Sequence, residues 1–138
     1  MSINQCKVLA LPKLVDSRGS LTFIEGTKHI PFAIKRIFYI YDLPIASSRG
    51  AHAHKECEQF IICLSGALDV HLDDGCIKRV VSLNKPWEGL YIPPYTWASE
   101  ENFASGSLYL VLASHDYDPT DYINNYDSFS TLTKYPRE

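Results

Sequence analysis

The feature that most constrains this chain is a series of short apolar segments, each ended by turn residues after about ten positions. Before Pro119 no segment has the sustained apolar periodicity of an amphipathic helix. Asp74-Gly75 lies between two alternating segments and indicates a tight hairpin, because a primed turn needs positive φ. Many short strands at regular spacing predict an all-β sandwich or barrel. The expected strands are 21–24, 34–41, 59–64, 67–72, 76–83, 89–92 and 107–113.

The end of the chain has a different pattern. Asp118 can cap a helix, and Pro119 is tolerated in a first helical turn. We therefore expect a short C-terminal helix over 122–129, with one aromatic face that packs on the sheet. The aromatic residues of this face are Tyr122, Tyr126 and Phe129.

Length and charge exclude several classes of protein. The 138 residues fit a single domain, 1–138, and the net charge of -3 argues against nucleic-acid binding, which requires a basic face. No apolar run reaches the roughly 18 residues of a membrane-spanning helix. The first residues show no secretory signal, and the four cysteines form no C-x-x-C pair. We expect a cytoplasmic protein with reduced thiols and no membrane partner.

The segment 49–55 contains the residues that are best suited to catalysis or ligand binding. His52 and His54 are two residues apart, so on a strand both side chains point to one face. On the inner face of a barrel, both imidazoles reach the same bound molecule. A surface pair, or two hydrogen-bonded core histidines, is the structural alternative. The residues that follow favour a functional role.

A spaced motif extends from the histidine pair. It consists of Gly50, His52, His54, Gln59 and Gly66. This spacing resembles the first motif of the cupin superfamily, whose members are jelly-roll (double-stranded β-helix) barrels. Metal-binding cupins have a glutamate at the Gln59 position and a third histidine at the Ala98 position. Since three protein ligands are usual for such metals, we expect no metal here, which leaves the histidines free as bases.

Further segments occur in order along the chain and narrow the resemblance. They include 16–21, 49–55, 89–91 and 117–123. Together they are similar to the sugar 3,4-ketoisomerase family, also called WxcM-like or FdtA-type cupins. The resemblance implies a dTDP-4-keto-6-deoxy-D-glucose substrate whose keto group moves from C4 to C3, without cofactor. It also implies a homodimer, and products used for 3-amino-3,6-dideoxy sugars of surface polysaccharides such as lipopolysaccharide O-antigen.

The resemblance also implies roles for three residues in proton transfer. His52 is expected to be the base that removes the C3 proton, which the neighbouring ketone acidifies. His54 is expected to protonate or hydrogen-bond the oxygen. Tyr39 is expected to donate a hydrogen bond to the sugar, with ordinary strand packing as the alternative.

Four residues are expected to bind the substrate. Arg18 and Arg49 each adjoin a glycine, and a guanidinium suits phosphate oxygens, although a solvated surface arginine is the alternative. Gln59 is expected to point inward and to bond the sugar or orient a histidine. Trp97 either lines the sugar or base pocket or closes the core.

Three other functions remain open at this point. A non-catalytic cupin that binds a sugar or small ligand fits a histidine pair without metal ligands. A 3,5-epimerase acts on similar substrates, but it usually pairs its histidine with an aspartate in a longer chain. A metal-dependent dioxygenase is disfavoured by Gln59 and Ala98. The sequence leaves the C4 configuration of the product and the preferred base undetermined.

Overall fold

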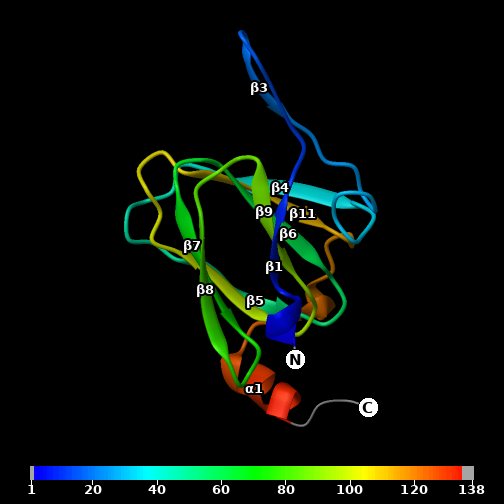
Figure 1. Cartoon of the computed structure of the whole chain (residues 1–138). Coiled ribbons are helices and arrows are strands. Elements are labelled where there is room, and N and C mark those ends of the chain that lie inside the picture. The colour runs from blue at the N-terminus through cyan, green and yellow to red at the C-terminus, as the bar shows by residue number, and fades with distance from the viewer. Residues whose placement is uncertain (1, 135–138) are drawn as a thin grey trace.

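Two five-stranded antiparallel sheets form the body of the molecule in the computed structural model, which describes residues 2–134 (Figure 1). The first has the order β1–β9–β6–β11–β4 and the second β12–β5–β10–β7–β8. The first-sheet strands are β1 (Lys7–Ala10), β9 (Glu88–Ile92), β6 (Gln59–Ser65), β11 (Leu108–Ala113) and β4 (Arg36–Ile40). The second-sheet strands are β12 (Tyr122–Ile123), β5 (Arg49–His54), β10 (Trp97–Glu101), β7 (Leu68–Asp73) and β8 (Lys78–Leu83).

A separate hairpin and three helical segments complete the fold. The hairpin of β2 (Lys13–Asp16) and β3 (Gly19–Thr22) extends away from both sheets (Figure 1). The helical segments are η1 (Ser2–Gln5), η2 (Pro119–Asp121) and α1 (Tyr126–Lys134). Within residues 2–134, every helix is too short or too polar to traverse a bilayer.

The all-β prediction is confirmed. Each expected strand is present, with ends displaced by one or two residues, and Asp74-Gly75 connects the β7–β8 hairpin. The sequence analysis considered β5 only as a possible strand and missed β1, β2, β10 and β12. These strands are short, and several combine apolar residues with lysine or acidic residues. Pairing with a neighbouring strand, and not local composition, makes them strands.

The prediction of a helix over 122–129 is wrong. Asp118 does act as a cap, accepting a hydrogen bond from the Thr120 amide, but it caps only the 3₁₀ turn η2. The chain then pairs with the edge of β5 as β12, and the helix begins later, at Tyr126. The free edge of β5 offers backbone partners to Tyr122 and Ile123, which are residue types that favour strands.

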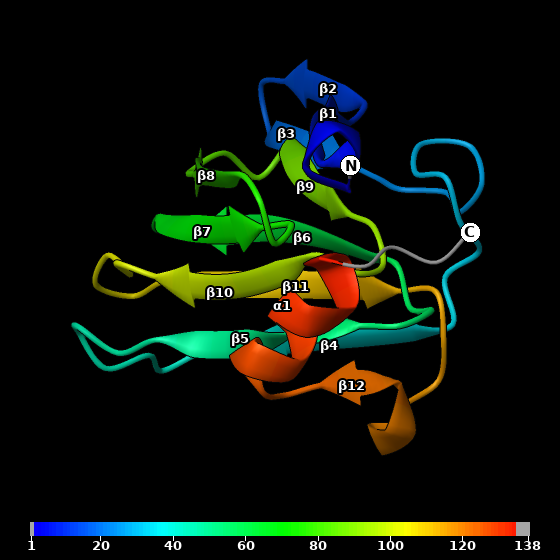
Figure 2. The ribbon, with the colours of Figure 1, turned by 90° about the horizontal axis from the view of Figure 1, so that it is seen from below.

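Three apolar clusters show which face of each strand is buried. The largest lies between the sheets, and a second lies on the outer face of the first sheet beneath the segment 24–34. The third joins Ala53 of β5 to Ile123 and Phe129, and Figure 2 shows α1 lying across the second sheet there. Because Ala53 faces α1, its neighbours His52 and His54 face the space between the sheets.

Candidate active site

The structure brings the two histidines together inside the barrel. Their ring centroids are 5.0 Å apart and the rings are nearly perpendicular. His52 is half-buried, and only 5% of His54 is exposed. Ala98 of β10 lies directly opposite His52 and belongs to the core between the sheets, which confirms that His52 points inward.

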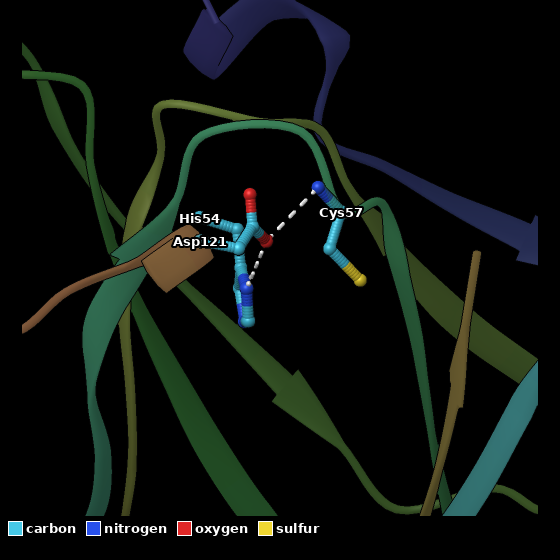
Figure 3. A group of neighbouring side chains, drawn as sticks. All are labelled: His54, Cys57 and Asp121. Carbon is cyan, nitrogen blue, oxygen red and sulfur yellow. Dashed lines mark hydrogen bonds and ion pairs between the residues drawn. The ribbon is translucent and has the colours of Figure 1, made fainter. Parts of the chain in front are cut away.

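Asp121 is a site residue that the sequence analysis missed. Its Oδ2 lies 3.0 Å from Nδ1 of His54, and Figure 3 shows the carboxylate beside the imidazole. The amide of Cys57 donates to Oδ2 at 3.3 Å, and the amide of Glu56 donates to the other oxygen at 2.7 Å. The only sequence signal was its place within 117–123, in the segment 118–121 that was expected to cap the helix over 122–129.

Tyr122 covers both imidazoles. Its ring centroid is 4.3 Å from that of His54 and 4.9 Å from that of His52. The ring of Tyr117 follows at 5.8 Å. Tyr122 was expected on a helix face, but the pairing of β12 with β5 places it opposite His54 instead. The aromatic ring therefore restricts the orientation of both histidines.

Arg36 supplies a positive charge to the same interior. Residues 35 and 36 point to opposite faces of their segment, and Arg36 is the one on the inner side, in line with Phe38. Its guanidinium carbon lies 5.4 Å from the Phe38 ring centroid and 5.6 Å from that of Tyr117. Among the described residues, its buried Nε has no hydrogen-bond partner.

Burial keeps both imidazoles neutral at neutral pH. Desolvation, together with the nearby His54 and Arg36, lowers the pKa of His52 to about 4. Desolvation also lowers the pKa of His54, although the hydrogen bond and charge of Asp121 oppose this shift. A neutral imidazole can accept a proton, so the site holds two proton acceptors side by side.

Gln59 and Arg49 lie on the strands that line this interior. Gln59 is buried at the start of β6, on the same side as Ile61 of the inner core. Arg49 is exposed at the start of β5 and pairs in register with Glu100 of β10. Glu100 is buried, and desolvation raises its pKa to about 7. Both predicted residues therefore lie on strands of the site.

Three predicted site residues lie away from the histidines within this chain. Tyr39 is on the outer face of β4, 60% exposed, with its ring centroid 5.9 Å from that of Tyr41. Arg18 is at the tip of the β2–β3 hairpin and pairs with Asp16 at 2.7 Å. Trp97 faces α1, because its neighbour Ala98 faces inward.

The donor set argues against a resident metal. Ala98 stands opposite His52, where a metal-binding cupin has its third histidine, and a methyl group offers no ligand atom. One other group has metal-ligating atoms within 4.8 Å of one another, namely His54, Cys57 and Asp121 (Figure 3). In that group the Asp121 oxygens accept three hydrogen bonds from the protein. The carboxylate therefore orients His54.

A jelly-roll barrel that holds two neutral histidines and an orienting carboxylate defines a cupin-type protein suited to proton transfer. The chain belongs to the FdtA family, described as WxcM-like, C-terminal, whose model matches residues 4–134. The chain is 49% identical over 123 residues to the TDP-4-oxo-6-deoxy-alpha-D-glucose-3,4-oxoisomerase of Aneurinibacillus thermoaerophilus, covering 89% of this chain and 88% of that protein.

Solved structures agree with this assignment. A histidine-to-asparagine mutant of the 3,4-ketoisomerase QdtA from Thermoanaerobacterium thermosaccharolyticum, in complex with TDP-4-keto-6-deoxyglucose, is 40% identical with a TM-score of 0.91, covering 94% of both chains. The TDP-quinovose 3,4-ketoisomerase WlaRB from Campylobacter jejuni is 46% identical with a TM-score of 0.88, covering 92% of this chain and 98% of that one. These similarities confirm the cupin-type jelly-roll prediction.

Proposed function

We propose that this protein is an isomerase that moves the keto group of dTDP-4-keto-6-deoxy-D-glucose from C4 to C3. The observation that carries the proposal is the pair of buried, neutral imidazoles side by side in the barrel. The relatives named above act on this class of nucleotide-linked keto-sugar, which supports the choice of substrate. Membership of the FdtA family favours this isomerase over an epimerase, a dioxygenase or a binding module.

The chemistry needs groups of the kind present in this site. The ketone at C4 acidifies the C3 proton, so a neutral imidazole is a sufficient base, and we assign this role to His52. The resulting enediol or enediolate carries partial negative charge on its oxygens. His54 serves as proton donor or hydrogen-bond partner there, and the cation of Arg36 stabilises the charge. The mechanism requires neither metal nor organic cofactor.

Substrate binding extends beyond the histidines. Arg49 and Gln59 lie on the strands that line the interior, and we assign them to the diphosphate and the sugar respectively. Arg18 and Trp97 were expected in the same role, and Tyr39 was expected among the catalytic residues as a hydrogen-bond donor to the sugar. Arg18 and Tyr39 are exposed on the hairpin and the outer face of β4, so in our proposal they reach the substrate in a homodimer.

Exposed apolar side chains support the homodimer. Leu14, Val15 and Leu21 of the hairpin and Ile37 of β4 are each more than half exposed. We expect the purified protein to have about twice its chain mass of 15.6 kDa by light scattering. Val15→Glu, which places a charge in that surface, is expected to shift the species toward a monomer. A monomeric wild type at assay concentration would contradict the homodimer.

We propose the cytoplasm as the location of the reaction. The structure contains free cysteines, among them the exposed Cys76, which suits a reducing compartment. The product would supply 3-amino-3,6-dideoxy sugars for surface polysaccharides such as O-antigen. A thiol titration of protein extracted under alkylating conditions tests the reduced state.

The experiment that tests the function is a proton NMR time course in deuterated buffer. Chelator-treated protein is mixed with dTDP-4-keto-6-deoxy-D-glucose. We expect 3-keto signals to appear with deuterium at C4, and the ring couplings give the C4 configuration. No product and no C3 exchange from folded protein would favour the binding module. Activity restored only by a divalent metal would contradict the metal-free mechanism.

The pH dependence of kcat/KM tests the assignment of His52. The base must be unprotonated, and the pKa of His52 is lowered from its usual 6.5 to about 4. We therefore expect protonation of His52 to lower kcat/KM only slightly between pH 7 and pH 5.5. A large decrease is expected as the pH falls through about 4. An acidic limb near 6.5 would contradict a desolvated base.

The same shift affects stability. Because the folded pKa of His52 lies below its unfolded value, its contribution to stability is full above about pH 6.5 and is lost as the pH falls through about 4. Circular dichroism at each pH is therefore needed to separate protonation of the base from unfolding. The kcat/KM values are compared only where the spectrum is unchanged.

A further inference from the structure

We propose that Glu100 is a positioning residue that controls Arg49. As a neutral acid it leaves the charge of the guanidinium to the diphosphate of the nucleotide, and as a carboxylate it competes for that charge. The inference rests on the proposed function, in which Arg49 binds the diphosphate, and deepens it by making the affinity for the nucleotide-linked sugar depend on pH. It gives a role to a buried acidic group that the proton-transfer chemistry leaves unused.

The first argument is the place of Glu100 in the barrel. β10 lies beside β5 (Figure 2), and Glu100 pairs in register with Arg49 at the start of β5. Side chains alternate along β10, so Glu100 points inward together with Ala98. The next residue, Glu101, points outward, with its Oε2 atom 3.3 Å from Nε2 of His71. The carboxyl group of Glu100 is therefore inside the barrel, opposite the residue assigned to the diphosphate.

The second argument is how closely Glu100 contacts the strand that carries Arg49. Gly50 has a φ of 76°, and a β-carbon at this position would overlap Oε2 of Glu100. The carboxyl oxygen thus occupies the space that a side chain at position 50 would fill. It lies against the backbone of the residue that directly follows Arg49.

The third argument concerns the titratable and charged groups around this carboxyl group. β11 contributes the buried Tyr109, whose pKa is raised by burial and by the charge of Glu100, while the charge of Arg49 opposes the rise. β6 contributes Cys63, whose thiol is neutral because burial raises its pKa. β4, β7 and β8 contribute apolar side chains of the inner core. Among the described residues, Arg49 is therefore the cation that acts on Glu100.

The Glu100 carboxyl group is poorly satisfied as an anion. Its Oε2 atom is buried and has no hydrogen-bond partner among the described residues. A buried carboxylate without such partners is costly, so the neutral acid is favoured. Burial raises the pKa of Glu100 to about 7, although a hydrogen bond to its own backbone amide and the charge of Arg49 oppose this rise. The group therefore changes its charge near neutral pH.

The charge of the ligand couples binding to this titration. The diphosphate of a nucleotide-linked sugar carries one negative charge on each phosphate, which disfavours a carboxylate beside Arg49. Binding therefore transfers a proton from the buffer to Glu100 whenever this group is ionised beforehand. By linkage, the affinity for the ligand falls as the pH rises through about 7.

The test is calorimetric binding of dTDP-D-glucose, which has the same diphosphate but no keto group, at pH 6 and pH 8. For the wild type we expect a dissociation constant about five- to tenfold higher at pH 8. Comparison of buffers with different ionisation heats should show uptake of about half a proton or more per ligand at pH 8. Glu100→Gln resembles the neutral acid and should bind at pH 8 as tightly as the wild type does at pH 6. Equal wild-type affinities at both pH values would overturn the proposal.

The controls separate this role from a structural one. Glu101→Gln removes the neighbouring carboxylate on the outer face and should keep the wild-type pH dependence. Burial lowers the pKa of His52 and His54 below 6.5, so both stay mainly neutral in this range. With the keto-sugar substrate, the pH effect should appear in KM and not in kcat. Weaker binding by Glu100→Gln at both pH values would indicate a structural role and overturn the proposal.

The outcomes also distinguish this inference from the proposed function. Binding that depends on pH, in a protein that does not convert the keto-sugar, would overturn the isomerase and support the role of Glu100. Turnover together with binding that takes up no proton at pH 8 would overturn the role of Glu100 alone. This last measurement uses the wild type, so it decides even if Glu100→Gln does not fold. No binding of dTDP-D-glucose at either pH would overturn both.

Discussion

Substitution of His52 by asparagine is expected to reduce kcat by about 10²–10⁴, because it removes the base that takes the C3 proton. The amide has no basic nitrogen and cannot accept a proton near neutral pH. Its size is close to that of the imidazole, so the half-buried position opposite Ala98 stays filled. The loss should therefore appear in catalysis and leave the affinity for dTDP nearly unchanged.

The control for this variant is a histidine outside the barrel. His71 lies on β7, 45% exposed in its side chain, with its Nε2 atom 3.3 Å from Oε2 of Glu101. His71→Asn is expected to keep wild-type activity, since it removes an imidazole of no catalytic role in this proposal. Turnover is measured by NMR, and dTDP affinity by calorimetry. A loss smaller than about tenfold in His52→Asn would show that another group is the base.

Substitution of Phe129 by alanine is expected to lower the free energy of unfolding by about 3–5 kcal/mol. Phe129 is fully buried and is the residue by which α1 contacts the sheet. Its ring lies 5.6 Å from that of Trp97 and packs in one cluster with Ala53 and Ile123. Truncation leaves a cavity behind β5, the strand that carries both histidines.

Two graded variants distinguish the loss of packing from a general effect of mutating α1. Phe129→Leu keeps part of the apolar volume and should cost less than the alanine variant. Leu132→Ala lies on the same helix at a position 37% exposed and should cost about 1 kcal/mol or less. Urea denaturation followed by circular dichroism gives all three values. Equal losses in Phe129→Ala and Leu132→Ala would contradict the anchoring role of Phe129.

The sequence predicted those parts of the fold and site that depend on local pattern. Alternation and turn residues predict most of the strands, and the two-residue spacing of His52 and His54 places both imidazoles on one face. The same parity argument predicts that either residue 35 or residue 36 faces inward. It cannot decide which one, because this depends on the register of β4 with β11.

Long-range pairing explains what the sequence analysis missed. Nothing local indicates that Asp121 and Tyr122 meet His54, since the contact joins residues far apart in the chain. A cap residue followed by regularly spaced aromatic residues is a reasonable helix signal. In the structure, however, the beginning of the segment pairs as a strand with the open edge of β5. Strand parity likewise places Trp97 on the side opposite Ala98, toward α1.

The pairing of β12 with β5 has a consequence for how the protein is made. Both sheets apart from β12 are encoded before Ser114, whereas Asp121 and Tyr122 follow the final long strand. Since a ribosome delivers the chain from its N-terminus, both sheets can assemble while the histidines still lack their carboxylate and aromatic cover. The pocket is thus finished last. A nascent chain stalled before residue 121 has its barrel and both imidazoles, but not the carboxylate that lies within hydrogen-bond distance of His54.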